Sequence, residues 1–296
     1  METLSSTLND DSLLAELRTY DIGDAGIDVD QHDSLSNLAA KSLATGTAEL
    51  LTPPSDTGSG EIGSALAIPV YRAGRIASIV VMSIKPKTVG AGVFEIWEPV
   101  DPYEEVKLRS GYFAHLERFA NVSSFVRFER GNGLPGQVWE SKQAVIHDDL
   151  PSHVGFLRAA GASAGLLQTA VGLPIISGDK LKSVAVVISS EATPIAKGYE
   201  VWNAVDDGFT LEGAAYQGLD PAFQLSRDAK LETDTGLPGL AAVHAGATTT
   251  ENDAILLAGR NQQNLSSDMG SAGPTAGLAI PAYRDNKLTS VMTFLF

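Results

Sequence analysis

The chain has 296 residues, of which 36 are acidic, 21 are basic and none is cysteine, so its formal charge is −15. This charge repels phosphate backbones and anionic lipid surfaces, and we expect neither nucleic acid nor membrane partners. The absence of cysteine excludes disulfides, thiolate nucleophiles, thiolate metal ligands and thioether-linked chromophores.

The sequence carries no targeting or membrane signal that we recognise. Residues 1–11 have neither a basic start nor an apolar run, which excludes a secretory signal. The longest apolar stretches, such as 76–84, are far shorter than the ~20 residues that span a bilayer. We therefore expect a cytoplasmic protein.

The first part of the chain contains two segments with helix-like spacing, at 13–17 and 35–51, the second with Ser34 or Ser36 as its N-cap. A β-hairpin follows at 64–82. Both of its strands are apolar on both faces, which predicts the middle of a covered sheet.

The chain then repeats itself. Three hairpins share an aliphatic residue followed by proline, and a serine farther on: Ile68-Pro69 and Ser78, Leu173-Pro174 and Ser183, Ile280-Pro281 and Ser290. Upstream of the second and third hairpins, a Glu-x-Trp strand and a Gly-Leu-Pro-Gly turn also recur: Phe94–Trp97 and Tyr199–Trp202, Gly133–Gly136 and Gly236–Gly239. The period slightly exceeds one hundred residues, so each repeat is the size of a domain.

These matches predict two complete units, 90–190 and 191–296, after an N-terminal partial unit, 1–89. In the partial unit, 35–51 corresponds to the Gly-Leu-Pro-Gly helix and the strand after it, but no Glu-x-Trp strand is recognised. We expect the open sheet edge to be covered by the N-terminal segment, a neighbouring unit or a second chain. Little linker separates the units, so we expect them to be rigidly coupled.

The central unit gives the clearest pattern of elements. In chain order we predict strands at 94–98 and 106–109, a helix or helical turn at 112–119, a strand at 124–128, a helix from Pro135 to Ser141, a strand at 144–146 and a helix at 156–164. The glycines at 131–136 are interpreted as positions for positive φ rather than as an anion cradle, because no lysine or arginine follows them.

The order of these motifs resembles a GAF domain, a small sensory module. The resemblance rests on Gly131–Trp139, on Ala144–Asp149 and on the hairpin that closes at Ser183–Ile188. It implies an α+β fold of repeated units, each with a central antiparallel sheet of five to six strands, helices on one face and a loop-roofed pocket on the other. GAF domains bind diverse small molecules or serve to dimerise, so function must be argued from the site.

If one unit binds a small molecule, the resemblance favours the central one. Family topology implies these pocket walls: Phe128, Trp139, Ile146, Asp148, Phe156, Arg158 and Thr169. Trp139 lies on the short helix, where an aromatic side chain either stacks on a planar ligand or fills the pocket itself.

Several known activities lack their residues. Bilin attachment and free-methionine-sulfoxide reduction depend on cysteine in the family, and the Asn-Lys…Phe…Asp-Glu signature of cyclic-nucleotide binders is not found. A cluster of His147, Asp148, Asp149 and His153 is interpreted as turn capping with exposed histidines rather than as a metal site. No catalytic motif such as Gly-x-Ser-x-Gly accompanies the histidines, and we predict no enzyme.

We therefore predict a non-catalytic sensory or regulatory module that binds a small molecule of unknown identity in the central unit. The alternative is a structural, dimerisation or protein-interaction module whose pockets are filled by side chains. No kinase, cyclase or DNA-binding segment accompanies the units, so we expect output through a homodimer or a separate protein. The two hypotheses differ in whether the space around Trp139 is empty or packed.

Overall fold

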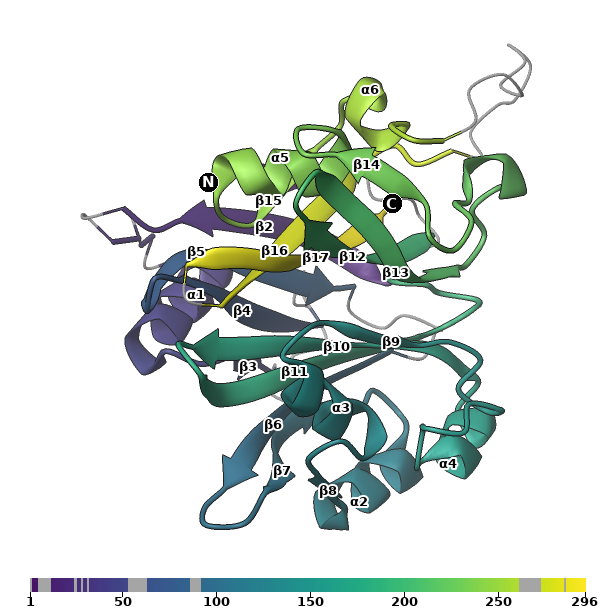
Figure 1. The fold of residues 1–296 in the computed structure, drawn as a ribbon. Coiled ribbons are helices and arrows are strands. Elements are labelled where there is room, and N and C mark those ends of the chain that lie inside the picture. Colours follow the sequence, from purple (N-terminus) through teal and green to yellow (C-terminus); the bar gives the residue numbers. More distant parts are fainter. Residues whose placement is uncertain are drawn as a thin grey trace.

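A computed structural model gives the positions of residues 2–4, 12–23, 26–27, 29–30, 32–52, 63–85, 92–260, 273–284 and 286–296. These residues form three antiparallel sheets of five, six and six strands, which follow one another along the chain (Figure 1). The antiparallel sheets of five to six strands expected from the sequence are confirmed.

The N-terminal sheet has the strand order β1-β2-β5-β4-β3. Its unit contains β1 (Glu2–Leu4), β2 (Leu14–Asp21), α1 (Ser34–Thr45), β3 (Glu49–Leu51), β4 (Ser64–Arg72) and β5 (Arg75–Ile84). The hairpin predicted at 64–82 is thus β4 and β5. Asp33, rather than Ser34 or Ser36, caps α1, because its side chain accepts hydrogen bonds from the backbone N–H groups of Leu35 and Ser36.

The helix predicted at 13–17 is wrong, because this segment enters strand β2. The strand pairs with β5 along most of its length, from Leu14 opposite Ile84 to Asp21 opposite Ser78. A strand that is covered on both faces needs no alternation of apolar and polar residues. The leucines of this segment therefore fall at a spacing that is also typical of a helix. β2 pairs with β5, the second strand of its unit's hairpin, and each Glu-x-Trp strand likewise pairs with the second strand of its own unit's hairpin. β2 is therefore the counterpart of the Glu-x-Trp strands, and the expectation that the N-terminal unit lacks this strand is also wrong.

The outer edge of β2 is covered by the N-terminal segment, one of the three predicted possibilities. Glu2, Thr3 and Leu4 pair with Thr19, Arg18 and Leu17. In the other two sheets the corresponding outer strand follows its neighbour along the chain, whereas β1 precedes β2. The N-terminal unit therefore fills the same place in its sheet by a different connection.

The central sheet has the order β8-β7-β6-β11-β10-β9. Its unit contains β6 (Gly92–Val100), β7 (Glu105–Tyr112), α2 (Glu117–Phe125), β8 (Arg127–Glu129), α3 (Gly133–Ser141), β9 (Val145–His147), α4 (Ala159–Ala164), β10 (Leu167–Ser177) and β11 (Lys180–Ser190). The C-terminal sheet, β14-β13-β12-β17-β16-β15, repeats this order. Its unit contains β12 (Gly198–Val205), β13 (Gly208–Tyr216), the 3₁₀ turn Pro221–Phe223, β14 (Lys230–Glu232), α5 (Gly236–His244), β15 (Thr248–Thr250), α6 (Asp253–Leu256), β16 (Gly277–Arg284) and β17 (Lys287–Leu295).

Two predictions in the central unit are corrected. Residues 112–119 are not one helical turn, since β7 extends to Tyr112 and α2 starts at Glu117. Most of the strand predicted at 124–128 is likewise displaced, because α2 continues to Phe125 and only Arg127 and Phe128 enter β8. Helix α2 buries only Phe119 and Ser123, so its apolar pattern was too weak to be distinguished from strand alternation.

Among the described helices, none is long and apolar enough to cross a membrane.

Both faces of every sheet are buried, and successive residues of one strand show this. In β5, Val80 and Met82 enter an apolar cluster that all three sheets share, while Ile79 and Val81 pack toward α1. The other two sheets do the same, with their outer faces covered by α3 and α5. The expected arrangement, with helices on one face and a roofed pocket on the other, is corrected here: helices and loops lie on one face, and the second face is buried in the shared core.

The three units form a closed ring around this core. β3 of the N-terminal unit lies against β6 and β7 of the central unit, and β9 of the central unit lies against β12 and β13 of the C-terminal unit. β15 of the C-terminal unit returns to β1 of the N-terminal unit. Each unit thus presents one sheet edge to the next, as subunits do in a cyclic oligomer.

The Gly-Leu-Pro-Gly turns have a structural explanation. Gly133 and Gly236 begin α3 and α5 with φ values of +61° and +69°, which favour glycine. A Cβ on Gly136 would lie 2.1 Å from the carbonyl oxygen of Glu129, so this residue must be small for the helix to approach the preceding strand.

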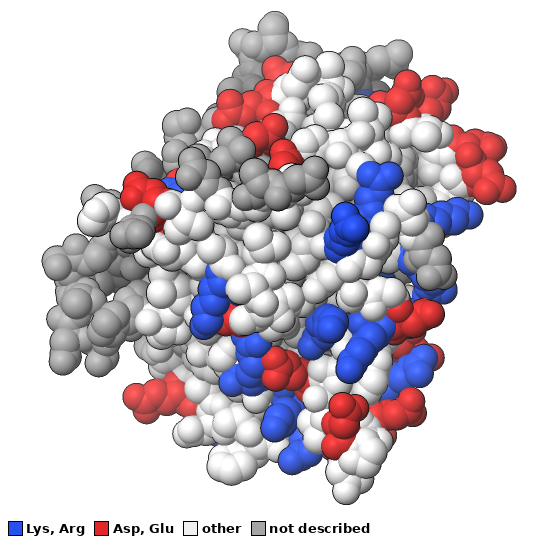
Figure 2. Space-filling model, turned by 90° about the vertical axis from the view of Figure 1, so that its left-hand side faces the viewer, with Lys and Arg blue, Asp and Glu red and all other residues white. Residues whose placement is uncertain are grey.

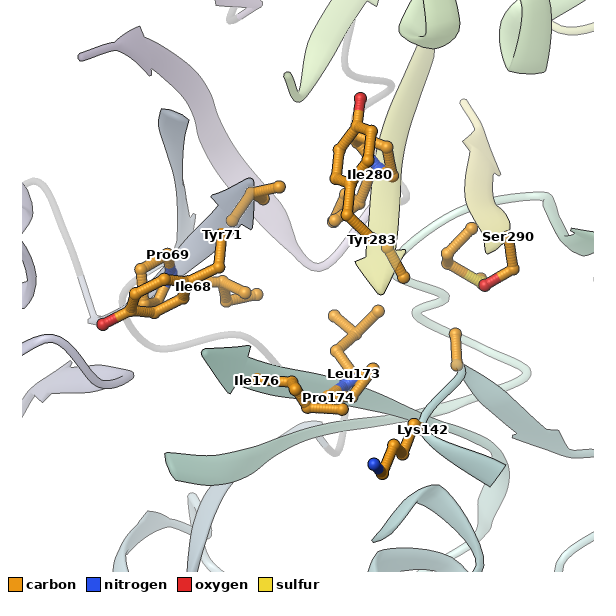
Figure 3. Close-up of a pocket in the computed structure, with 15 residues that line it drawn as sticks. Ile68, Pro69, Tyr71, Lys142, Leu173, Pro174, Ile176, Ile280, Tyr283 and Ser290 are labelled. Carbon is orange, nitrogen blue, oxygen red and sulfur yellow. The ribbon is translucent and has the colours of Figure 1, made fainter. Parts of the chain in front are cut away.

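Buried serines join neighbouring units. The Ser78 hydroxyl oxygen accepts the backbone N–H of Ala247 at 2.8 Å, and the equivalent Ser183 accepts the hydroxyl of Thr47 at 2.7 Å. The third equivalent, Ser290, instead lines a cavity of about 30 Å³ together with Ala144. Figure 3 shows equivalent residues of β4, β10 and β16 around this cavity at the centre of the ring.

We expect the serine bonds to contribute to stability unequally. Ser78→Ala leaves the buried N–H of Ala247 without its acceptor and should lower the free energy of unfolding by about 1–3 kcal/mol. Ser290→Ala removes no such bond to a described residue and should cost clearly less. Urea denaturation of both variants measures the difference, and equal losses would contradict this account of the junctions.

Candidate functional site

The helix-covered face of the central sheet contains a buried ion pair. Glu95 lies in the middle of β6 and Arg158 directly precedes α4, and their side chains are 0% and 1% exposed. Arg158 Nη2 donates to Glu95 Oε2 at 2.9 Å, and its Nη1 donates to the other carboxylate oxygen and to Ser123 Oγ. The indole N–H of Trp97, two residues along the strand, donates to Glu95 at 3.0 Å. Every oxygen of this buried carboxylate therefore has a donor.

Four aromatic rings surround the Arg158 guanidinium. Its central carbon lies 4.6 to 5.8 Å from the ring centres of Phe119, Phe156, Trp97 and Phe128. Such an aromatic box is a favourable environment for a cation. In this structure the cation is a side chain of the protein itself, so the space beneath the helices is filled.

The structure brings together only some of the seven predicted wall residues. Phe128, Phe156 and Arg158 belong to the aromatic box, and Trp139 is half-buried against the same apolar cluster. Ile146 instead packs against the shared core. Asp148 and Thr169 form a separate hydrogen bond of 2.6 Å, which lies at the junction with the C-terminal unit because Thr169 also accepts the side-chain amide of Gln217.

The C-terminal unit repeats the ion pair. Glu200 is equivalent to Glu95, and Arg260 donates to it at 2.8 Å with both side chains buried. Trp202 again donates its indole N–H to the carboxylate, and Tyr216 adds a hydroxyl donor at 2.8 Å. An ion pair between the glutamate of a Glu-x-Trp strand and an arginine far along the chain therefore recurs in both units.

The N-terminal unit has the same device with its charges exchanged. The residue opposite Val81 on β2 is Arg18, at the place that Glu95 and Glu200 occupy opposite Val186 and Thr293. Arg18 pairs with Asp33, the capping residue of α1, and with Glu16 at 2.7 Å. The pair is thus present in all three units, but the strand supplies the cation in the first.

Glu95 and Glu200 were missed as site residues, although the sequence contained a signal. A carboxylate in the middle of an apolar strand is rarely buried without a partner. Its recurrence at the same place in both Glu-x-Trp strands therefore indicated two buried ion pairs. The identity of the arginine partner carried no signal, because Arg158 and Arg260 lie in dissimilar segments.

The histidines interpreted as exposed turn residues are arranged differently. His147 is 1% exposed, and its ring stacks on that of His153 with centres 3.9 Å apart. His147 Nε2 contacts Gln137 Oε1 at 2.9 Å. Burial, followed by the neighbouring His153, lowers the pKa of His147 to about 4. Within the described part of the chain, no three His, Asp or Glu side chains are grouped as metal ligands.

A group of exposed basic side chains lies on one side of the molecule. The turns of the three hairpins project from the same side of the molecule, which Figure 2 views directly, and Lys and Arg are spread across the middle of that face. Six exposed basic residues lie in or beside these turns, and we call them the basic crown: Arg72, Arg75, Lys180, Lys182, Arg284 and Lys287. None of the six forms an ion pair with a described residue.

The three turns of the crown lie close to one another. Arg72 donates to Asn286 Oδ1 at 3.2 Å and lies over the Tyr283 ring, which joins the first and third turns. The ammonium of Lys142 and, more weakly, the charge of Arg284 lower the pKa of Asp179, so the third turn is also near the second. Because β5, β11 and β17 begin with Arg75, Lys180 and Lys287, one basic residue recurs at the same place in every unit.

Comparison with known proteins gave matches among solved structures only; no family model and no curated protein sequence matches the chain. The GAF domain of A. aeolicus nlh2 is 18% identical over 33% of this chain and 57% of its own length, with a TM-score of 0.27. The GAF domain of a phosphoenolpyruvate-protein phosphotransferase from Coxiella burnetii is 21% identical over 34% and 56%, with a TM-score of 0.28. These are GAF domains, the family that the motifs resemble.

A free methionine-R-sulfoxide reductase from Neisseria meningitidis also matches, with 16% identity over 35% of this chain and 53% of its own, and a TM-score of 0.27. The chain thus spans little more than half the length of each of these three structures. Likeness of fold does not transfer an activity, so the function is argued from the side chains above.

Breaking the central ion pair should be costly. Arg158→Met leaves the Glu95 carboxylate buried without its counterion and should lower the free energy of unfolding by about 3–5 kcal/mol. Adding Glu95→Met should restore much of the loss, because apolar side chains can replace a buried pair. Urea denaturation measures both. Lys142→Met, which breaks an exposed pair with Asp179, is the control and should cost less than about 1 kcal/mol.

Stability should also depend on the protonation of His147. Its pKa is about 4 in the folded chain and near 6.5 when unfolded, so between these values the unfolded chain binds more protons. The free energy of unfolding should therefore fall as the pH decreases from about 6.5 to 4, by on the order of 2 kcal/mol more than in His147→Gln. Parallel pH profiles of the two proteins in urea titrations would contradict this.

Proposed function

We propose that this chain is a non-catalytic interaction module, a rigid ring of three sheets that docks an acidic protein partner on its basic crown. The observation that carries the proposal is the crown itself. Its six exposed cations come from three separate hairpins, and none of them forms an ion pair with a described residue. A concentration of one charge on one face favours encounter with a surface of the opposite charge.

The filled site in the central unit supports an interaction role over small-molecule binding at that place. A ligand under α2 and α4 would have to displace the Arg158 guanidinium from four aromatic rings and from Glu95. Displacement leaves a buried carboxylate without a counterion, which is strongly unfavourable. Of the two sequence-based hypotheses, the module with side-chain-filled pockets is the one that we retain for the central unit.

The rest of the molecule favours an acidic protein surface over a nucleic acid or a membrane. Outside the crown, 15 basic residues face 36 acidic ones, so a nucleic acid that runs beyond the crown meets a repulsive surface. The turn residues Ala73, Gly74, Gly178 and Asn286 offer no large apolar side chain for insertion into a membrane. A protein surface that matches only the crown avoids both difficulties.

The test is charge reversal with a matched control. The crown variant carries Arg75→Glu, Lys180→Glu and Lys287→Glu, and the control carries Lys107→Glu, Arg118→Glu and Lys230→Glu, three exposed basic residues elsewhere. Both lose the same net charge. Binding of a fluorescent 20-residue polyglutamate peptide is measured by anisotropy at two salt concentrations. We expect at least tenfold weaker binding by the crown variant, at most threefold weaker binding by the control, and weaker binding by the native protein at the higher salt.

Three outcomes would contradict the proposal. Equal weakening by the crown and control variants would show that only net charge matters. Tighter binding of a 20-nucleotide oligothymidylate, or of phosphatidylserine vesicles, than of the peptide would assign the crown to another class of partner. Self-association of the native chain in sedimentation velocity, abolished by the crown variant, would assign it to a second copy of the chain.

A further inference from the structure

Helix α2 lies on the outside of the central unit, away from the other two sheets (Figure 1). Four of its exposed residues are spaced i, i+3, i+4 and i+7, so they lie along one side of the helix: Arg118, Asn121, Val122 and Phe125. We call these four residues the α2 stripe. The Phe125 side chain is 86% exposed, so most of its ring stays in water until another surface covers it.

An open hollow of about 330 Å³ adjoins the other end of the α2 stripe. It lies between the start of α2 and the end of α4, and its apolar walls are Leu116, Phe119, Ala164 and Leu166. Arg118 lines the hollow as well, so the stripe leads into it. Phe119 is 2% exposed, and the Arg158 guanidinium lies 4.6 Å from its ring centre. This wall of the hollow is therefore fixed by the buried ion pair and needs little reorganisation to receive a side chain.

The α2 stripe and the hollow make this face complementary to a second copy of itself. Phe125 and Arg118 are seven residues apart, which is roughly 10 Å along a helix. When two α2 helices pack antiparallel about a two-fold axis at Asn121 and Val122, the Phe125 ring of each copy meets Arg118 and the hollow of the other. Such a contact is isologous, so one fit is made twice and the assembly closes as a dimer. The Arg118 guanidinium also offers the incoming ring a cation.

The charges beside the α2 stripe favour a second copy over a foreign partner. Glu117 begins α2 and Arg127 follows its end, so an antiparallel pair of helices brings opposite charges together at both ends. Neither Glu117 nor Arg118 forms an ion pair with a described residue. A surface with both signs of charge selects neither an acidic nor a basic partner, whereas a copy of itself matches both signs. This local match opposes the repulsion between two chains that each carry a net charge of −15.

We propose that two copies of the chain associate reversibly through α2, each inserting Phe125 into the hollow beside Arg118 of the other. Two phenylalanine side chains bury roughly 150–250 Å² each. With the adjoining parts of α2 and α4, we expect the contact to bury about 1,000–1,200 Å², the low end of specific interfaces. A dissociation constant on the order of 10–100 µM follows from a contact of this size. The proposal does not rest on the proposed function, because the α2 stripe and the basic crown share no residue.

Sedimentation velocity of the full chain between about 5 and about 500 µM measures the association. We expect a reversible equilibrium between monomer and dimer. Phe125→Ser removes the inserted ring and Ala164→Phe fills the hollow, and each should weaken dimerisation at least tenfold. Val243→Ser is the matched control, because this valine of α5 is 76% exposed and lies in another unit, and its dimerisation should stay within about twofold of the native chain. Circular dichroism confirms that each variant is folded.

Cross-linking shows which surfaces meet. The chain has no cysteine, so one introduced thiol reports a single position. Val122→Cys places a thiol beside the two-fold axis, and oxidation with copper phenanthroline should join two copies through a disulfide. Adding Phe125→Ser to this variant should slow the cross-link at least tenfold, and Val243→Cys should remain monomeric.

Three outcomes would overturn the proposal. A native chain that stays monomeric at about 500 µM excludes the dimer. A dimer that neither Phe125→Ser nor Ala164→Phe weakens excludes this contact, and if the triple crown variant abolishes that dimer, self-association belongs to the crown instead. Equal cross-linking through Val122→Cys and Val243→Cys shows random collision rather than a specific contact.

Discussion

In the described part of the chain every sheet is buried on both faces, and that constraint determines the rest of the structure. A sheet of this kind is stable only when both faces are covered, and each unit has helices for one face alone. The other face is covered by the remaining two sheets, through side chains such as Val80, Phe94 and Met292. A unit cut from the ring would expose that entire face to water. Burial of this face in each unit therefore depends on the other two units.

The sequence predicted the parts of the fold that are locally specified. The hairpins β4–β5, β10–β11 and β16–β17 combine long apolar strands with short turns, and they were recognised three times over. β2 was missed because a strand covered on both faces lacks the alternation that identifies strands. β2 also lacks the Glu-x-Trp motif by which the equivalent strands were recognised. Arg18 occupies the position of Glu95 and Glu200, and no tryptophan follows it in the strand. The ring itself depends on contacts between distant segments, which no local pattern encodes.

The candidate site, like the fold, was predicted from the sequence only in part. Phe128, Phe156 and Arg158 were identified through family topology, and the structure brings them together. Whether such a group encloses a ligand or a side chain depends on which residue fills the centre, and spacing along the chain does not determine that. Thr169 was also identified but acts elsewhere, since it orients Gln217 across a junction between units. A residue on the right strand can thus serve a neighbouring site, because every strand here has two buried faces.

The junctions between units differ, although they occupy equivalent places. In a ring of three identical chains, a substitution at one junction appears at all three. A substitution that weakens the contact therefore weakens every junction of the ring. Here the three units are covalently joined, so each junction is encoded by its own codons and can change alone. Ser290 and Ala144 line a small cavity at the position where Ser78 and Ser183 bond to the neighbouring unit. Because the three units share one chain, one junction can differ while the other two hold the ring closed.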